Sequence, residues 1–457
     1  MQKTIVINAV GLTPSLLGAH TPNLAAFVNK GQLASVGPVL PAITTTVQST
    51  YLTGATPAEH GIVGNGWYFR DECEIGFWRQ CDVLVQRPRI WEKARQLDPA
   101  FTCANCFWWY AMYSRADVAI TPRPMYPADG RKLPDVWTNP PQLRFDLQKE
   151  LGQFPLFNFW GPATSIAASR WIAESAIRVD RRFNPTLNLI YLPHLDYSFQ
   201  RFGPDLSHPR IQQDLRELDD VCGRLFEHFA KARIVVLSEY GIAPVSRPVH
   251  LNRRLRQAGL LCIREELGHE LLDAGASRAF AVADHQFAHI YVNDASSLDQ
   301  VRELIARTPG VAEVFDAAGK QAHHLDHSRS GELIAVAEPD AWFTYYYWLD
   351  DARCPDFART VDIHRKPGYD PVELFLDPSL FAPKLKIAWK LWQRKLGLRT
   401  LLDVIPLDSS LVKGSHGRVP ACPEDGPLLT TNQPGLVPAG QVEATAVYSV
   451  LMDHLAR

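Results

Sequence analysis

Near its start the chain reads TIVINAVG over residues 4–11. β-Branched and apolar residues fill this run until Gly11 breaks it, so we predict a central buried strand that ends in a loop. Next, Thr21 and Pro22 supply a cap and first position for a helix, and residues 23–30 have helical periodicity. A strand followed by such a helix is typical of an α/β domain.

Further apolar runs of strand length occupy residues 187–192 and 233–238, and a third occupies 280–283 together with 289–292. Between the first two of these runs, residues 208–231 carry apolar side chains at helical spacing. Strands that alternate with helices predict a mainly parallel sheet covered on both faces. We therefore predict a three-layer α/β/α fold.

Patterning along the chain predicts three parts. Residues 1–250 form the first part of the α/β core, residues 250–350 a smaller α+β insertion, and residues 351–457 complete the core. Residues 66–160 are rich in Trp, Tyr, Phe and Pro, and we interpret them as irregular elaborations at the carboxyl edge of the sheet, where α/β proteins bind ligands. Their aromatic rings fit either a stacking wall for a planar group or ordinary core packing.

Composition excludes several classes of protein. The 457 residues include 47 Lys+Arg against 49 Asp+Glu, a formal net charge of −2, with 46% hydrophobic and 21% charged residues. These values argue against a disordered chain and against a basic protein that binds nucleic-acid polymers. Of the eight cysteines, Cys103 and Cys106 have CxxC spacing, but no second pair lies at zinc-ribbon distance. We expect reduced, packed thiols.

The chain opens without the pattern of a signal peptide, and no apolar stretch is long enough for a transmembrane span. We therefore expect a cytoplasmic protein. Residues 380–402 combine Lys and Arg with Trp, Leu and Ile. This segment fits a peripheral contact with a membrane or a partner, but a surface helix docked by its apolar stripe is the interpretation we favour.

Four loops carry polar residues that a simple core does not require: Thr44, Asp196, Glu239 and His416. Taken singly, each has an ordinary structural role. A threonine or an aspartate caps a helix, and a lone histidine is often a hydrogen-bonding residue. Taken together at one edge of a parallel sheet, a hydroxyl, two carboxylates and an imidazole are the parts of a metal-assisted hydrolase.

Longer motifs surround these four residues. They are TPNL at 21–24, Pro41, Thr53-Gly54, EHGIVGN at 59–65, YLP at 191–193 with FGP at 202–204, SEYG at 238–241 and GSHG at 414–417. Their order and spacing resemble the alkaline phosphatase superfamily, and most closely its nucleotide pyrophosphatase/phosphodiesterase branch. The resemblance covers roughly residues 4–420.

The resemblance implies a hydrolase of phosphate esters that acts on a small phosphorylated substrate. Enzymes of that branch attack phosphorus with a Thr or Ser beside two zinc ions and form a covalent phospho-enzyme. Matched to the motifs, Thr44 is the nucleophile, and Asp196 and His416 are ligands of the second zinc ion.

The sequence departs from the family pattern at five functional positions. Val10 stands where the first strand loop has a metal-binding Asp, Gln200 replaces a histidine ligand, and Glu239-Tyr240 replace an Asp-His pair. Val47 stands where an Asn usually helps to bind the phosphoryl oxygens. Valine cannot ligate a metal, and Tyr and Gln are poor substitutes for zinc-binding imidazoles.

Three interpretations follow from these departures. In the first, which we take as the main prediction, Asp196, Glu239, Gln200 and His416 hold a rearranged site for Zn, Mn, Mg or Ca, since oxygen-rich ligands suit the harder ions. In the second, Lys366, Arg365 or Arg418 stabilises the phosphoryl charge with little help from metal. In the third, the chain is an inactive descendant that binds a phosphorylated ligand or a protein partner.

Substrate contacts are expected from Tyr240, Asn65, Lys366 and Arg418. Additional polar candidates lie at Asn8, His20, His60, His194, Asp284, His285 and the stretch 362–370. The pair His285 and His289 has i,i+4 spacing, but its context predicts a turn entering a strand rather than a metal motif.

Overall fold

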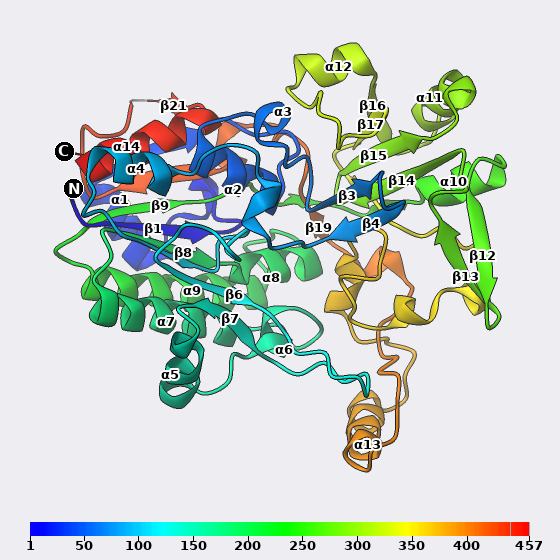
Figure 1. Ribbon diagram of the computed structural model, residues 1–457, viewed down its shortest axis with the longest axis horizontal. Helices are drawn as coiled ribbons and strands as arrows, with labels where there is room; N and C mark the ends of the chain where they lie inside the picture. Colours follow the sequence, from blue (N-terminus) through cyan, green and yellow to red (C-terminus); the bar gives the residue numbers. More distant parts are fainter. Residues whose placement is uncertain (439, 457) are drawn as a thin grey trace.

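The computed structural model describes residues 1–438 and 440–456. A nine-stranded sheet forms the middle of the larger lobe, at the left in Figure 1, and most of its neighbouring strands are parallel. In spatial order the strands are β21 (Gln441–Val442), β2 (Gln32–Val36), β20 (Leu428–Thr431), β9 (Arg233–Leu237), β1 (Thr4–Ala9), β8 (Leu187–Leu192), β5 (Cys103–Cys106), β6 (Val118–Pro122) and β7 (Val136–Asn139). β20 is antiparallel to both of its neighbours, and β7 is antiparallel to β6.

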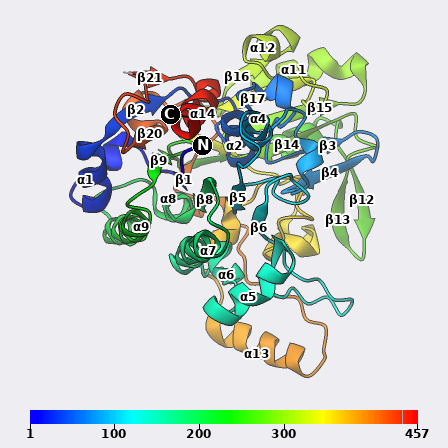
Figure 2. The ribbon, with the colours of Figure 1, turned by 60° about the vertical axis from the view of Figure 1, so that its left-hand side comes forward.

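Helices cover both faces of this sheet (Figure 2). One layer contains α1 (Pro22–Lys30), α5 (Gln142–Leu151), α7 (Ala167–Phe183), α8 (His194–Phe202) and α9 (Pro209–His228). The other contains α2 (Thr44–Thr53), α4 (Ile90–Leu97) and α14 (Val447–Ala456). The predicted three-layer α/β/α architecture is therefore confirmed.

Strand β1 lies in the middle of the sheet, and every one of its side chains is buried. It pairs in parallel with β8 on one side and β9 on the other, so that Thr4 lies opposite both Leu187 and Arg233. All six residues of β8 are also buried. This register brings the carboxyl ends of β1, β8 and β9 to one edge of the sheet, where parallel α/β folds place their sites.

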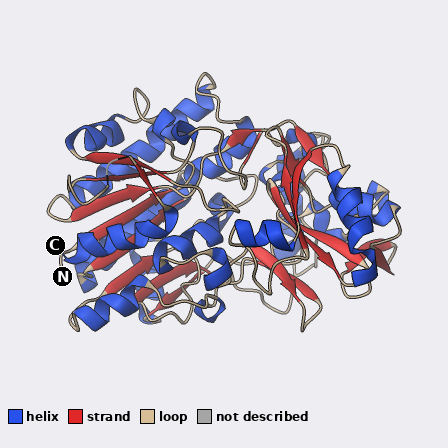
Figure 3. Ribbon diagram, turned by 90° about the horizontal axis from the view of Figure 1, so that it is seen from above, coloured by secondary structure: helices blue, strands red, loops and turns tan. Residues whose placement is uncertain are grey.

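A second, four-stranded sheet forms a separate lobe (Figure 3). Its order is β14 (Ala279–Asp284), β15 (Phe287–Val292), β17 (Leu333–Ala337) and β16 (Val311–Phe315), and all its pairs are antiparallel. The hairpin β12 (Cys262–Glu266) and β13 (His269–Asp273) and the helices α10 (Leu251–Gln257), α11 (Leu298–Ala306) and α12 (Ala317–Ala322) accompany it. The apolar runs at 280–283 and 289–292 lie in this lobe rather than in the main sheet, and the two-residue turn between β14 and β15 makes them a hairpin.

The aromatic region 66–160 is more regular than its sequence suggests. It begins with the hairpin β3 (Gly66–Phe69) and β4 (Glu74–Phe77), and it then supplies β5, β6 and β7 to the main sheet. These strands escape prediction because they are only four or five residues long. Cys103 and Cys106 lie on β5 as buried free thiols, and burial raises the pKa of both.

The remaining short elements are α3 (Pro57–His60), α6 (Leu156–Phe159), β10 (Ala243–Pro244), β11 (Arg247–Val249), β18 (Ala341–Phe343) and β19 (Gly414–Ser415). Helix α13 (Pro383–Lys395) projects from the body of the molecule (Figure 1). Across residues 1–438 and 440–456, no helix combines the length and apolar character needed to cross a membrane.

Candidate active site

Four side chains predicted from separate motifs meet at the carboxyl edge of the main sheet. Thr44 is the first residue of α2, Asp196 lies in the first turn of α8 just after β8, and Glu239 follows β9. His416 follows β19, which pairs with β10. Thr44 and Asp196 lie in the first turns of helices and Glu239 and His416 follow strands, so the fold itself fixes their positions.

A chain of hydrogen bonds connects Thr44 to Asp196 through Tyr240. The Thr44 Oγ1 lies 3.0 Å from the Tyr240 Oη, and this hydroxyl donates to Asp196 Oδ1 at 3.3 Å. A phenol has only one proton to donate. Because that proton points to Asp196, the Thr44 hydroxyl is the donor to Tyr240, and a proton has a continuous path from Thr44 to the carboxylate.

Asp196 is held from its other side by Gln200, one helical turn later on α8. The Gln200 Nε2 donates to Asp196 Oδ2 at 2.8 Å, and the Gln200 Oε1 accepts from the Tyr369 hydroxyl at 2.9 Å. Burial raises the pKa of Asp196 to about 7, although the bonds from Tyr240 and Gln200 oppose this rise. The carboxyl group therefore exchanges its proton near neutral pH.

His416 presents an unprotonated nitrogen to this carboxyl group. Its Nδ1 lies 2.7 Å from the Ala42 carbonyl oxygen, which only an N–H can satisfy, so Nε2 carries the lone pair. Among the described residues this buried Nε2 has no hydrogen-bond partner, and it lies 3.5 Å from Asp196 Oδ1. Burial, with the nearby His285, lowers the pKa of His416 well below its ordinary value, so the ring is neutral.

Aromatic stacking and close backbone packing orient the His416 ring. The ring stacks on Tyr240 at a centroid distance of 3.7 Å and meets the ring of His285 at 3.7 Å. The approach of β19 to α8 requires Gly414, because a Cβ there would lie 2.2 Å from the Phe199 carbonyl oxygen.

Glu239 is bound by amide groups. Its Oε1 accepts from Asn8 Nδ2 at 2.5 Å and from Gln48 Nε2 at 2.6 Å. Burial raises the pKa of Glu239 to about 8, so the group is largely protonated at neutral pH. Its Oε2 is buried and lacks a partner within the part of the chain that the structure describes. Nearby Val10 is fully buried and apolar.

These groups do not fit the two-zinc centre that the resemblance implies. The first zinc position offers Val10 and a Glu239 whose oxygen is already bonded to two amides. At the second, Asp196 and the free Nε2 of His416 fit one divalent ion, whereas Gln200 Oε1 is bonded to Tyr369. The Nε2 of His285 is a further unpartnered nitrogen on the pocket wall, as judged over the described residues.

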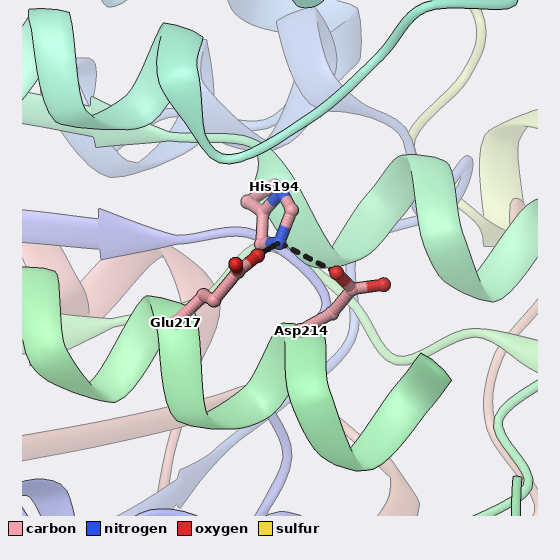
Figure 4. A group of neighbouring side chains, drawn as sticks. All are labelled: His194, Asp214 and Glu217. Atoms are coloured by element: carbon pink, nitrogen blue, oxygen red, sulfur yellow. Dashed lines mark hydrogen bonds and ion pairs between the residues drawn. The ribbon is translucent and has the colours of Figure 1, made fainter. Parts of the chain in front are cut away.

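A separate group of potential metal ligands lies behind this edge. His194, Asp214 and Glu217 form the one group of three such residues found among the described residues (Figure 4). The His194 Nε2 lies 3.1 Å from Asp214 Oδ1 and 3.7 Å from Glu217 Oε2. Arg210 contacts both oxygens of Asp214, at 2.9 and 3.1 Å. Because the Arg210 guanidinium already balances the charge of the Asp214 carboxylate, the group is a structural ion-pair cluster.

The pocket in front of Thr44 has a volume of about 90 Å³ and is mostly apolar. Thr44, Asp196, Tyr240 and His416 lie on its wall. Its other lining residues are largely aromatic: Trp78, Trp109, Tyr126, Phe157, Phe159, Trp160, Tyr191, Tyr197 and Tyr369. A mostly apolar pocket with a few convergent polar groups is typical of a small-molecule site.

The other predicted site residues lie outside the pocket wall. Asn65 binds the backbone of the α2 start, since its Oδ1 accepts from the Thr45 N–H at 3.1 Å. Lys366 is buried between Asp370 and Glu373, with both ion pairs at 2.7 Å. Arg418 donates to the carbonyl oxygen of Ala337 at 3.2 Å. Glu239 and Gln200 lie one layer behind the wall and contact it through the bonds described above.

His285 and the stretch 362–370 were named from the sequence only as additional candidates, and both contribute residues to the pocket wall. His285 lies in the β14–β15 turn and stacks on Tyr369 at 3.6 Å. Its Nδ1 lies 2.8 Å from Asp284, whose carboxylate accepts the Asn65 N–H at 2.9 Å. Polar residues around 285 and in 362–370 marked these stretches as candidates, but no sequence pattern showed that both line the same pocket as Thr44. Lys132 also reaches this wall.

Comparisons with known proteins agree with this geometry. The family model described as type I phosphodiesterase / nucleotide pyrophosphatase matches residues 4–370. An uncharacterized pyrophosphatase/phosphodiesterase of Schizosaccharomyces pombe is 24% identical over 250 residues, which are 53% of this chain and 45% of that protein. The aligned region thus spans less than half of that relative.

Solved structures share the fold along the whole chain. Murine ectonucleotide pyrophosphatase / phosphodiesterase 5, solved as an inactive variant in complex with AMP, has a TM-score of 0.60 and 15% identity, covering 100% of this chain and 95% of that one. Phosphonoacetate hydrolase from Sinorhizobium meliloti, with phosphonoformate, has a TM-score of 0.61 and 14% identity, covering 99% and 96%.

The family model confirms the predicted nucleotide pyrophosphatase/phosphodiesterase-like branch, and the solved structures confirm the fold. Because one family model spans most of the sequence, the chain belongs to the type I phosphodiesterase / nucleotide pyrophosphatase family.

Proposed function

We propose that this protein hydrolyses esters of small phosphorylated molecules and that Thr44 is its nucleophile. The observation that carries the proposal is the bonded series from the Thr44 hydroxyl through Tyr240 to Asp196 at the wall of a pocket. Thr44 is also the first residue of a ten-residue helix. The positive end of that helix dipole favours an anionic phosphoryl group beside Thr44.

The first chemical step forms the bond between Thr44 Oγ1 and phosphorus. The proton of the Thr44 hydroxyl passes to Tyr240 as the proton of Tyr240 passes to Asp196, and the ester oxygen leaves with its bonding electrons and is protonated by water. In the second step a water oxygen bonds to phosphorus and Thr44 leaves with the bonding electrons, taking back the proton from Asp196 through Tyr240. One proton of that water stays on the phosphate product, which departs, and the other neutralises the hydroxide formed in the first step. Tyr240 contacts both Thr44 and Asp196 and orients the nucleophile.

Asp196 and His416 would hold one divalent ion, and Zn, Mn, Mg and Ca are the candidates. An ion there would supply positive charge that stabilises the phosphoryl oxygens. The neutral His416 ring, with its free Nε2, is in the protonation state that a metal ligand requires.

The proposal is tested by turnover of bis(p-nitrophenyl) phosphate and p-nitrophenyl phosphate, before and after chelation and with each ion restored. We expect Thr44→Ala to abolish turnover, Thr44→Ser to retain part of it, and Thr53→Ala, at the other end of the same helix, to behave as wild type. Wild-type turnover in Thr44→Ala would contradict the assignment. Loss of activity on chelation would assign Asp196 to the ion, and retained activity would assign it to the proton.

A second function is favoured by one observation, the replacement of the first metal position by Val10 and an amide-bonded Glu239. A protein with such a pocket would bind a phosphorylated ligand without hydrolysing it. This alternative predicts no turnover with any ion, together with a higher Tm in the presence of phosphorylated ligands, because they bind only the folded state.

A further inference from the structure

Helix α13 carries an apolar stripe that faces away from the molecule. All of its residues, Pro383–Lys395, are described, and none is buried. Leu385, Trp389 and Trp392 are 72%, 55% and 51% exposed, and Leu396, just after the helix, is 59% exposed. Their spacing of i, i+4, i+7 and i+11 places them on one face. The docked helix favoured from the sequence is therefore wrong, because this stripe has no covering surface in the described chain.

The same helix is tethered to the body by its other faces. Ile387 packs with the small apolar cluster that includes Val404 and Ile405. Lys386 and Lys390 pair with Asp403 at 3.0 and 3.2 Å. These contacts hold the helix so that the stripe stays outward, and the two Trp rings stack on each other at a centroid distance of 4.9 Å.

The charge of the surrounding segment is strongly one-sided. Residues 380–402 contain six Lys or Arg and no Asp or Glu, although the whole chain has a net charge of −2. Lys384, Lys395 and Arg399 are exposed beside the stripe. A Trp/Leu stripe bordered by basic side chains suits the boundary between anionic headgroups and acyl chains, where each cation near the surface adds about 1 kcal/mol.

We infer that α13 docks this protein onto an anionic lipid surface. A second copy of the chain is the poorer occupant, because a two-fold contact would oppose the same basic patches. At a bilayer surface both kinds of side chain gain favourable contacts, since the apolar stripe enters the acyl boundary while the cations reach the anionic headgroups.

The segment that follows α13 contacts a loop of the pocket wall. The Arg399 Nη2 donates to the Ala128 carbonyl oxygen at 3.1 Å, which links the end of this segment to the loop that contributes Arg123, Tyr126 and Lys132 to the pocket wall. Tyr126 is 55% exposed.

Sedimentation with vesicles tests the docking. We expect the full-length protein to bind phosphatidylcholine vesicles that contain phosphatidylglycerol, to bind pure phosphatidylcholine vesicles at least tenfold more weakly, and to be released by salt. The variant Trp389→Ser/Trp392→Ser should lose at least tenfold in affinity. The control Val83→Ser/Leu267→Ser, which removes two exposed apolar side chains elsewhere (77% and 101% exposed), should bind as wild type.

Two results would overturn the inference: wild-type protein that ignores anionic vesicles, or a Trp variant that binds them unchanged. A concentration-dependent dimer that the Trp variant abolishes would assign the stripe to a second copy instead. The outcome is independent of catalysis, because the Trp variant should hydrolyse soluble nitrophenyl esters at the wild-type rate, and inactive Thr44→Ala should still bind vesicles.

Discussion

Replacing Tyr240 by Phe removes one oxygen atom from the centre of the site. Thr44 then loses its acceptor at 3.0 Å and Asp196 loses a donor at 3.3 Å, while the ring can still stack on His416. General acid–base catalysis contributes about 10²–10⁴-fold to a rate, so we expect kcat/KM to fall by at least about 10²-fold, or about 2.7 kcal/mol at the transition state. Losing the two buried bonds should lower the free energy of unfolding by about 1–3 kcal/mol.

The Tyr240→Phe substitution should also change how kcat/KM depends on pH. The proton path requires ionised Asp196, whose pKa is about 7, so wild-type kcat/KM should rise with pH through that value. The bond from Tyr240 lowers the pKa of Asp196 against the larger effect of burial. Its removal should therefore move the midpoint to higher pH as well as lower the plateau.

The assay is kcat/KM for bis(p-nitrophenyl) phosphate between about pH 5 and 9. Tyr197→Phe is the matched control, because Tyr197 lies on the same pocket wall and no described hydrogen bond joins its hydroxyl to Thr44. If Tyr240→Phe keeps the wild-type plateau and midpoint, the proton path is refuted.

Three further predictions concern neighbouring groups. Glu239 has a pKa of about 8 in the fold against an ordinary 4.5, so the stability that depends on its protonated state is fully present below pH 4.5 and is lost as pH rises through 8. Glu239→Gln should therefore unfold like wild type in urea at pH 4 but be more stable than wild type at pH 9, by on the order of 4 kcal/mol. Equal stabilities at pH 9 would contradict this. Lys366→Met leaves Asp370 and Glu373 buried without their cation and should lose about 3–5 kcal/mol in urea unfolding, whereas a loss below 1 kcal/mol would show that the ion pairs are dispensable. His416→Ala should weaken binding of a divalent ion at least about tenfold by isothermal titration, and unchanged affinity would remove His416 from the ion site.

The sequence predicted the fold where strands are buried on both faces. The runs at 187–192 and 233–238 became β8 and β9, because a parallel strand covered on both sides needs a continuous apolar stretch. β5 and β20 were missed since each is only four residues long and includes polar or small side chains. Strands of this kind depend on neighbours that are distant in sequence.

The sequence indicated which residues lie at the candidate site, but it did not indicate which hydrogen bonds join them. Thr44, Asp196 and His416 were placed from where they follow strands or begin helices. The bond between Thr44 and Tyr240 joins residues 196 apart in sequence, so no local pattern encodes it. In the same way, no local pattern shows that Lys366 is buried against Asp370 rather than free to meet a phosphoryl group.

The most direct test of the central claim is to trap the covalent intermediate. Wild-type protein is mixed with bis(p-nitrophenyl) phosphate, quenched in acid within one turnover and digested for peptide mass spectrometry. The account predicts a nitrophenyl-phosphoryl group on the peptide that contains Thr44, and no such adduct in Thr44→Ala. Steady hydrolysis with an unmodified Thr44, or with the adduct on another side chain, would contradict it.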